Sequence, residues 1–423
     1  MTPRRSRTPA FALMLSLVGC AGRSGEPPSP PLQAVHARAL TDVRFERTPA
    51  RIARGRYLAD AAIGCVLCHS ERDESRPGAP PVPGREFAGR IVADEPGRFL
   101  VAPNLTPDLE TGAGSWSDDM LARAIREGVG HDGRGLSGPM WWWAFRSLSD
   151  EDVASIVAYL RTLPPVRHLL PVRRLTTERE LGRAQGAKPL VAPVATRDLA
   201  APLERGRYLI EIADCMGCHS AWEAPINAGL GAGGNELENG VFSANLTPDP
   251  SGIGGYTEEI FVGVLRSGRG GTLHSVMPWA AYRNMPDEDL RAIYQALRLL
   301  PAVAHRVHNG APPTLCPVCG QRHGLGELNR PPRLERVETD LGPLEAYAGD
   351  YRFGTDDIEV VARDGRLWIT GFAEPDIELV PVAGGRLRGI GFPSPLSFER
   401  DATGAVTALI TDDLGQTRWA REP

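Results

Sequence analysis

Lysine is nearly absent from this chain of 423 residues: of its 47 basic residues, only Lys188 is lysine. Any electrostatic docking surface must therefore be built from arginine. An excess of one charge is also lacking, because 47 basic and 52 acidic residues leave a formal net charge of −5, which argues against nucleic-acid binding. The composition, with 42% hydrophobic and 23% charged residues, excludes wholesale disorder, and the length predicts two to four domains.

Long hydrophobic runs are lacking too, since the one marked apolar run, at 11–18, is too short to span a bilayer as a mature helix. It follows three arginines and ends in Leu-Val-Gly-Cys20, which resembles the bacterial lipobox, whose cysteine is lipidated. We expect residues 1–20 to be a lipoprotein signal peptide, with an ordinary signal peptide as the alternative, and 21–50 to be a Pro/Gly/Ser-rich tether. This predicts lipid anchoring on the periplasmic side of a bacterial membrane, an oxidising compartment.

Six of the seven cysteines form three pairs with two residues between the partners, and histidine directly follows two of these pairs. Cys-x-x-Cys-His is the attachment pattern of haem c, in which the thiols bond to the porphyrin vinyl groups and the histidine is the proximal iron ligand. The residues concerned are Cys65, Cys68 and His69, and Cys215, Cys218 and His219. We predict two covalently bound haem c groups. A disulfide or half a zinc site is the alternative for either motif taken alone.

The flanks of the two motifs repeat each other. Arg-Gly-Arg-Tyr-Leu precedes each motif, Asn-Leu-Thr-Pro-Asp follows it, and each copy closes with an acidic start and an amphipathic helix, predicted at 149–164 and 286–301. Such duplication implies two tandem copies of one small helical fold. We place these copies at 51–165 and 204–302, with a linker at 166–203.

One methionine lies in the same irregular stretch of each copy, Met140 in the first and Met277 in the second, and aromatic residues follow both. We predict these methionines as the sixth iron ligands, opposite the proximal histidines. His131 and His274 lie in the same loops, but nine residues before Met140 and three before Met277. Because the repeat preserves the methionine and moves the histidine, a histidine in the sixth position is the weaker alternative.

With these motifs the sequence resembles the multihaem cytochrome c subunits of membrane-associated alcohol, gluconate and related sugar-acid dehydrogenases. The resemblance covers about 51–302. Besides the haem motifs and the repeated flanks, the residues that carry it are Trp116, Asp118 and Asp119 and the Met277-Pro278-Trp279 loop. It implies class I-like cytochrome c domains. Such subunits usually carry three haems, whereas this chain has two haem motifs.

The resemblance also implies site residues and partners. The axial pairs that it implies are His69 with Met140 and His219 with Met277. It implies thioether bonds at the four motif cysteines and a role for the Asn104 and Asn245 loops in holding haem propionates. The implied electron donor is an exported dehydrogenase, and the implied acceptor is quinone, another cytochrome or an oxidase.

The third cysteine pair, Cys316 and Cys319 in a Cys-Pro-Val-Cys-Gly sequence, lacks the following histidine and should carry no haem. It falls in the segment 303–337, which we expect to be a linker. We favour a local disulfide. A zinc site with His323 or His308 as further ligands and a redox-active dithiol are the alternatives. The histidines that we expect to be exposed polar residues are His36, His168, His305 and His308.

From 338 to 423 the pattern changes to short alternating stretches separated by turn signals, which predicts a β-meander that forms a small sheet or half-barrel. The predicted strands are Ile358–Ala362, Arg366–Thr370, Ile377–Pro381, Arg386–Ile390, Leu396–Phe398 and Val406–Thr411. With Tyr-Ala-Gly-Asp-Tyr at 347–351, the region resembles the lipocalin-like C-terminal domains of some β-lactamase-related hydrolases and implies an accessory role. The fold class that we expect is mainly α: two tandem class I-like cytochrome c domains followed by a small all-β domain.

The function that these features predict is electron transfer between an exported dehydrogenase and a respiratory acceptor, without catalysis by the chain itself. A dihaem peroxidase-like enzyme is one alternative, but its chemistry needs an open iron position and the repeated methionines argue against it. A haem-containing sensor or binding protein that works through its β-domain is the other.

Overall fold

In the part of the chain that the computed structural model describes, the α-helices precede the strands of a C-terminal barrel. The residues described are 37–76, 78–136, 139–175, 187, 189–190, 192–221, 228–237, 240–270, 276–331, 337, 339–353, 356–370, 376–389, 395–412 and 416–422. Within them, no helix has both the length and the apolar character needed to cross a membrane.

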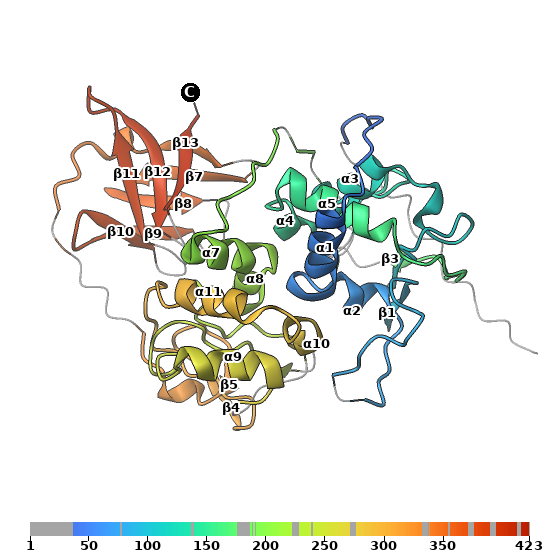
Figure 1. Cartoon of the computed structure of the whole chain (residues 1–423). Coiled ribbons are helices and arrows are strands. Elements are labelled where there is room, and N and C mark those ends of the chain that lie inside the picture. Colours follow the sequence, from blue (N-terminus) through green and yellow to red (C-terminus); the bar gives the residue numbers. More distant parts are fainter. Residues whose placement is uncertain are drawn as a thin grey trace, which may run out of the picture. The chain divides into compact units, whose positions relative to one another are not determined.

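The helices recur in the same order in the two repeats (Figure 1). In the first repeat they are α1 (Pro49–Tyr57), the π-helical turn η1 (Leu58–Ala62), α2 (Cys65–His69), the 3-10 turn η2 (Ala113–Ser115), α3 (Asp118–Glu127), α4 (Trp142–Phe145) and α5 (Asp150–Leu160). In the second they are α7 (Pro202–Ile212), α8 (Cys215–His219), α9 (Glu258–Ser267), α10 (Trp279–Tyr282) and α11 (Asp287–Leu297). The predicted helices at 149–164 and 286–301 are thus confirmed as α5 and α11, with shorter ends.

The first and last helices of each repeat cross at a glycine. A Cβ added to Gly55 of α1 would lie 1.9 Å from the carbonyl oxygen of Ser155 in α5. The equivalent Gly206 of α7 would place a Cβ 2.0 Å from the carbonyl oxygen of Ala292 in α11. Only a residue without a side chain allows the two backbones to come this close. The repeated Arg-Gly-Arg-Tyr-Leu sequence is therefore a helix-packing feature.

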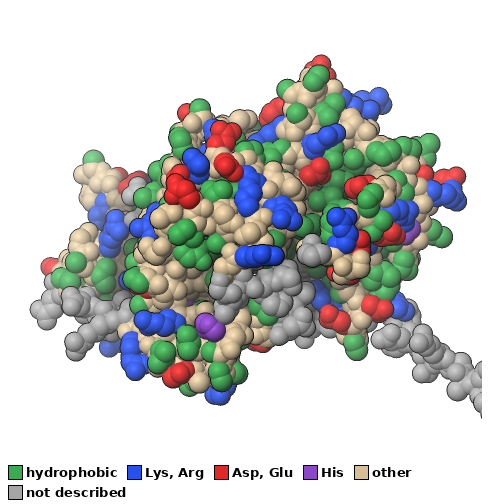
Figure 2. Space-filling view, turned by 60° about the horizontal axis from the view of Figure 1, so that its bottom comes forward, with side chains coloured by type: hydrophobic (Ala, Val, Ile, Leu, Met, Phe, Trp, Pro, Cys, Tyr) green, Lys and Arg blue, Asp and Glu red, His purple; other side chains and the backbone are tan. Residues whose placement is uncertain are grey.

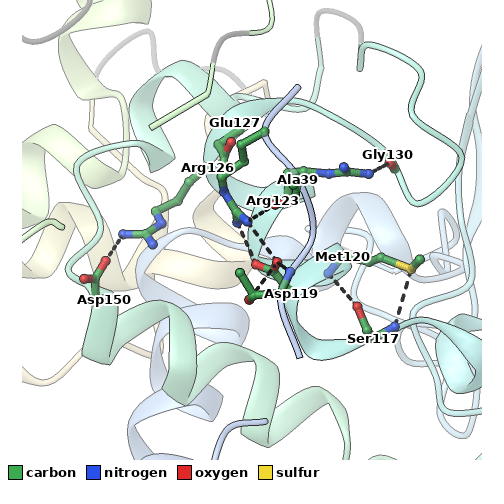
Figure 3. Close-up of polar contacts among 11 residues, drawn as sticks. Ala39, Ser117, Asp119, Met120, Arg123, Arg126, Glu127, Gly130 and Asp150 are labelled. Atoms are coloured by element: carbon green, nitrogen blue, oxygen red, sulfur yellow. Dashed lines mark hydrogen bonds and ion pairs between the residues drawn. The ribbon is translucent and has the colours of Figure 1, made fainter. Parts of the chain in front are cut away.

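Polar contacts fasten the segment that precedes α1 to helix α3. The Arg38 guanidinium donates to both carboxylate oxygens of Asp119, at 2.6 and 2.8 Å, and to Glu127 at 2.8 Å. The backbone N–H of Thr41 donates to the same Asp119 carboxylate at 2.6 Å. Figure 3 shows Asp119 and Glu127 of α3 facing this segment at Ala39. The acidic first turn of α3 thus anchors the chain that enters the first repeat.

The strands of the described residues form three separate sheets. β1 (Arg90–Glu95), β2 (Arg98–Ala102) and β3 (Arg174–Leu175) form an antiparallel sheet, and β4 (Pro313–Leu315) pairs with β5 (Arg322–Gly324). The third sheet is a closed antiparallel barrel made of β6 (Gly349–Phe353), β7 (Asp356–Arg363), β8 (Arg366–Thr370), β9 (Ile377–Val382), β10 (Arg386–Gly389), β11 (Leu396–Arg400), β12 (Val406–Asp412) and β13 (Gln416–Arg421). Two further short 3-10 turns are η4 (Gly326–Leu328) and η5 (Leu344–Ala346).

The barrel corrects the expected fold class. Neighbouring strands pair in sequence order, as a meander requires, but β13 also pairs with β6 through Ala420 with Arg352 and Arg421 with Tyr351. This pairing closes the sheet, which is therefore neither open nor a half-barrel (Figure 1). With 29% helix and 20% strand, the chain is not mainly α, and the fold alone does not identify class I-like cytochrome c domains. Full closure leaves the barrel without an exposed sheet edge.

Separate hydrophobic clusters stabilise these parts. One large cluster includes buried side chains from both repeats, such as Leu58 and Leu148 from the first and Leu209 and Leu290 from the second. A second cluster fills the barrel around Tyr351. Arginine and acidic side chains are interspersed on the face drawn in Figure 2, as expected for a chain with little net charge.

Candidate haem sites

Both Cys-x-x-Cys-His motifs form five-residue helices that end at the histidine. The residue before each helix, Gly64 before α2 and Asp214 before α8, adopts a left-handed conformation, with φ at +63° and +52°. Glycine adopts this conformation without steric cost, and aspartate is one of the few other residues that tolerate it. The same sharp turn therefore begins both motifs.

The two motif histidines are held in the orientation that a proximal iron ligand needs. Nδ1 of His69 lies 2.9 Å from the carbonyl oxygen of Pro103, and Nδ1 of His219 lies 2.7 Å from that of Ala244. Because a carbonyl only accepts, Nδ1 carries the proton and Nε2 keeps its lone pair for a metal. Burial lowers the pKa of both imidazoles and favours this neutral form.

The carbonyls that receive these histidines directly precede the repeated asparagines. Asn104 donates through Nδ2 to the carbonyl oxygen of Val166 at 2.8 Å, and Asn245 donates to that of Val303 at 2.8 Å. Each amide oxygen accepts the backbone N–H two residues further on. Both amides are thus used within the chain, so they brace the loop behind the histidine, where the resemblance implied contacts with haem propionates. The repeated asparagine could have signalled this brace.

All four motif cysteines are free thiols and are not joined in disulfides. Burial raises the pKa of Cys65 and Cys215 to about 12 and that of Cys218 to about 11, so these three thiols are neutral in their surroundings.

The predicted distal methionines occupy the same turn in the two repeats. The backbone N–H of Trp142 donates to the carbonyl oxygen of Met140 at 2.8 Å, and that of Trp279 to the carbonyl oxygen of Met277 at 2.7 Å. Both methionines are partly buried and pack against the core cluster that also contacts Cys65. The structure thus places the methionines and the haem motifs around one apolar core.

Each methionine turn is fixed by a tryptophan that packs on a glycine. A Cβ on Gly128, which ends α3, would lie 2.6 Å from the Trp142 ring, and one on Gly268, which ends α9, would lie 3.0 Å from the Trp279 ring. Both glycines have positive φ, at +67° and +65°. Replacing either glycine would therefore displace the ring and, with it, the turn that carries the methionine.

Of the two competing histidines, the structure describes only His131. His131 stacks on Trp116, with ring centroids 4.2 Å apart and an interplanar angle of 11°. His274 and His36 lie outside the described residues, as does the predicted lipidation site Cys20.

The third cysteine pair differs from our expectation. Cys316 and Cys319 are free thiols and form no disulfide. His305, which we expected to be exposed, is fully buried beside them, and His323 is 1% exposed. Nδ1 of His308 instead accepts the backbone N–H of Gly310, at 3.2 Å.

Asp214 connects the two repeats at the second motif. Its carboxylate accepts a hydrogen bond of 3.2 Å from Nε1 of Trp143, in the first repeat. Burial raises the pKa of Asp214 to about 6. A carboxyl whose pKa rises on folding binds more protons in the folded state, so its contribution to stability falls as pH increases through the interval from about 4 to 6.

Asp214→Asn tests this contribution. Asparagine tolerates the left-handed conformation and can still accept the Trp143 bond. We expect the stability of the variant relative to the native protein to increase between pH 4 and pH 6 and then to level off. Urea midpoints measured across this range check the prediction, and a difference that does not vary with pH would contradict it.

Comparison with known proteins finds related cytochromes. The chain is 30% identical over 318 residues to a dihaem c-type cytochrome of Cereibacter sphaeroides, a match that spans 71% of this chain and 99% of that protein. It is 30% identical over 307 residues to the fructose dehydrogenase cytochrome subunit of Gluconobacter japonicus, which spans 65% of this chain. It is 28% identical over 284 residues to the gluconate 2-dehydrogenase cytochrome c subunit of Pantoea cypripedii, which spans 60% of this chain.

The relatives differ in how much of their length they share. The chain spans 60% of the length of each of these two dehydrogenase subunits. No family model matches the chain. The match with the dihaem cytochrome, by contrast, covers nearly the whole of that relative.

Proposed function

This chain belongs to the dihaem c-type cytochromes, which makes it an electron-transfer protein and not a catalytic subunit, and we propose that it carries one covalent haem c at each Cys-x-x-Cys-His motif. The observation that carries the proposal is the matched pair of motif histidines, each donating from Nδ1 to a backbone carbonyl. Because the two motifs have the same local geometry, we infer that both bind the same group, haem c. Haem supplies reversible one-electron chemistry at its iron.

The chain's own residues attach, orient and enclose these groups. The cysteines of α2 and α8 would form the thioether bonds, and His69 and His219 would each supply one iron ligand. Met140 and Met277 would supply a second ligand for each iron, from turns that Trp142 and Trp279 of α10 hold in place. A buried setting and a thioether ligand both raise a haem potential.

The electron donor that we propose is suggested by the names of the relatives. Two of these are cytochrome subunits of fructose and gluconate dehydrogenases, so an exported dehydrogenase is the proposed donor for this chain. Quinone, another cytochrome or an oxidase is the proposed acceptor. We also propose that Cys20 anchors the chain by lipid on the periplasmic side of the membrane, on the strength of its lipobox-like sequence. Purification from the native membrane and identification of the co-purifying dehydrogenase test the donor.

The distal ligands are tested by carbon monoxide, which binds ferrous haem only where the sixth position is open. We expect the native protein to resist carbon monoxide at both haems, and Met140→Ala and Met277→Ala each to bind about one equivalent. The matched control is Met120→Ala, because Met120 lies in α3 and its sulfur accepts the Ser117 N–H.

Two results would overturn the assignments. If native ferrous protein bound two equivalents at once, the irons would not be six-coordinate, and peroxide turnover would then point to a peroxidase. The second result is a measured mass equal to that of the unmodified polypeptide after production with a cytochrome maturation system. It would show that the chain carries no covalent haem.

A further inference from the structure

Four side chains of the types that ligate metals converge just after the second repeat. They come from the segment that contains the hairpin of β4 and β5, labelled in Figure 1. The residues are His305, Cys316, Cys319 and His323, and one ligand atom from each lies within 4.8 Å of the other three. Three of these side chains are 0% exposed and the fourth is 1% exposed. Four ligands of this type, enclosed by protein, make up a structural zinc site.

The distances between the ligand atoms fit a tetrahedral ion. Nε2 of His305 lies 3.2 Å from Nε2 of His323 and 3.4 Å from Sγ of Cys316, while Sγ of Cys319 lies 3.4 Å from Nε2 of His323. Zinc bonds of about 2.0–2.1 Å to nitrogen and 2.3 Å to sulfur place neighbouring tetrahedral ligands about 3.3–3.8 Å apart. The four side chains are thus already spaced around a common centre.

The two imidazoles cannot satisfy each other. Nδ1 of His305 donates to the carbonyl oxygen of Ala232 at 2.8 Å, and Nδ1 of His323 to that of Gly324 at 3.1 Å. In the neutral rings the facing Nε2 atoms are then both acceptors, and two lone pairs at 3.2 Å repel unless a cation lies between them. A carbonyl behind each ligating imidazole is also the usual support of a zinc-bound histidine.

Donors surround the first cysteine in the manner of a metal-bound thiolate. Nδ2 of Asn329 donates to Sγ of Cys316 at 3.2 Å, and the backbone N–H of Val318 donates to the same atom at 3.4 Å. Such hydrogen bonds stabilise negative charge on sulfur. The Cys-x-x-Cys sequence thus forms the knuckle typical of structural zinc sites.

The site is closed to solvent and reactants. The cysteines pack in a small apolar cluster with Ala232 and Val303. A Cβ on Gly234 would lie 2.6 Å from Cε1 of His305, so the backbone itself covers this side. A redox-active dithiol needs access to its partner, and two cysteines with 0% exposure lack it. The enclosure favours a structural ion with four protein ligands.

The first repeat contains a histidine equivalent to His305 but no cysteine pair beside it. His168 follows Leu-Pro-x-Val-x in the first repeat as His305 does in the second. Its Nδ1 bonds to the Ala88 carbonyl oxygen at 2.9 Å and its Nε2 lies 3.5 Å from Glu71, with the side chain 22% exposed. The two histidines share their backbone position and their Nδ1 bond, and only the second faces thiols.

We propose that His305, Cys316, Cys319 and His323 bind one structural zinc ion, which fastens the β4–β5 hairpin to the second repeat. The ion would also support the second haem motif. Ala232, which accepts from His305, is followed by Gly233, whose N–H donates to the carbonyl oxygen of His219 at 2.7 Å. On this assignment the described residues 303–331, which we expected to be part of a linker, form a metal-stabilised unit.

Metal analysis of the full-length protein, matured with haem, tests the proposal. We expect about one zinc per chain in the native protein and in His168→Ala, and almost none in His305→Ala or Cys319→Ser. His168→Ala is the matched control because it removes the equivalent imidazole without removing a ligand. A native chain without zinc, with another metal in its place, or with zinc retained in both ligand variants would overturn the proposal.

Cobalt substitution tests the same site in the native protein, so its result does not depend on whether the variants fold. After removal of zinc with a chelator, Co²⁺ should give the visible bands of a tetrahedral site and thiolate-to-metal charge transfer in the native protein. Octahedral bands only, or a mass two hydrogens lower that reveals a Cys316–Cys319 disulfide, would overturn the assignment. Staining the denatured chain for haem on a gel reports on the haems separately.

Discussion

Gly206→Ala is expected to lower the stability of the second repeat by about 2–3 kcal/mol, although the change adds a single methyl group. The new Cβ would lie 2.0 Å from the carbonyl oxygen and 2.5 Å from the carbonyl carbon of Ala292, and 3.0 Å from Cβ of Ala296. These are mostly backbone atoms of α11, which cannot rotate away as a flexible side chain can. The helices α7 and α11 must therefore separate, and the core packed behind them loosens.

Gly55→Ala should have an effect of similar size in the first repeat. Its Cβ would meet the Ser155 carbonyl oxygen at 1.9 Å and Cβ of Tyr159 at 2.8 Å. Equal losses of stability at the two positions would show that the glycine allows the same close helix crossing in both repeats.

Gly263→Ala is the matched control for both variants. Gly263 lies within α9, and a Cβ there would meet nothing within 4 Å. Alanine in an open helical position stabilises by about 0.5–1 kcal/mol relative to glycine. Urea unfolding followed by far-ultraviolet circular dichroism measures all three variants. Midpoints for Gly55→Ala and Gly206→Ala at or above the native value would refute the close-crossing explanation.

The features that sequence could predict are those encoded locally. The amphipathic helices α5 and α11 begin in acidic turns and end four residues before a proline. Six barrel strands lie where alternation and turn residues predict them. These helix and strand signals each lie within about 15 residues of chain, where backbone preferences dominate. The haem attachment and the methionine ligands stay predictions, which rest on motif spacing and on the comparison of the two repeats.

The features that sequence missed depend on contacts between distant segments. Barrel closure needs β13 to pair with β6, some 70 residues earlier, and no local pattern marks either strand as a partner. The burial of His305 depends on thiols 11 and 14 residues away and on the Ala232 carbonyl. The sequence did contain one signal for the position of His305. His168 stands at the equivalent place in the first repeat, after the same Leu-Pro.

Asp152→Ala is expected to cost about 3–4 kcal/mol, the second of the two largest effects. Asp152 lies in the first turn of α5 and is 6% exposed. Its carboxylate accepts two hydrogen bonds of 2.8 Å from Arg54 and one of 2.6 Å from the Tyr208 hydroxyl, which comes from the second repeat. Removing the carboxylate leaves a partly buried guanidinium and a buried hydroxyl without their acceptor.

Glu151→Ala, one position earlier, is the control that separates burial from charge. Glu151 also receives two bonds of 2.7 Å from an arginine, Arg51, but its side chain is 50% exposed. An exposed ion pair contributes about 1 kcal/mol or less. The same urea midpoints compare the two variants. Equal shifts for Asp152→Ala and Glu151→Ala would mean that the contact between the repeats through Tyr208 adds nothing. A much larger shift at Asp152 would identify this buried acceptor as a principal link between the repeats.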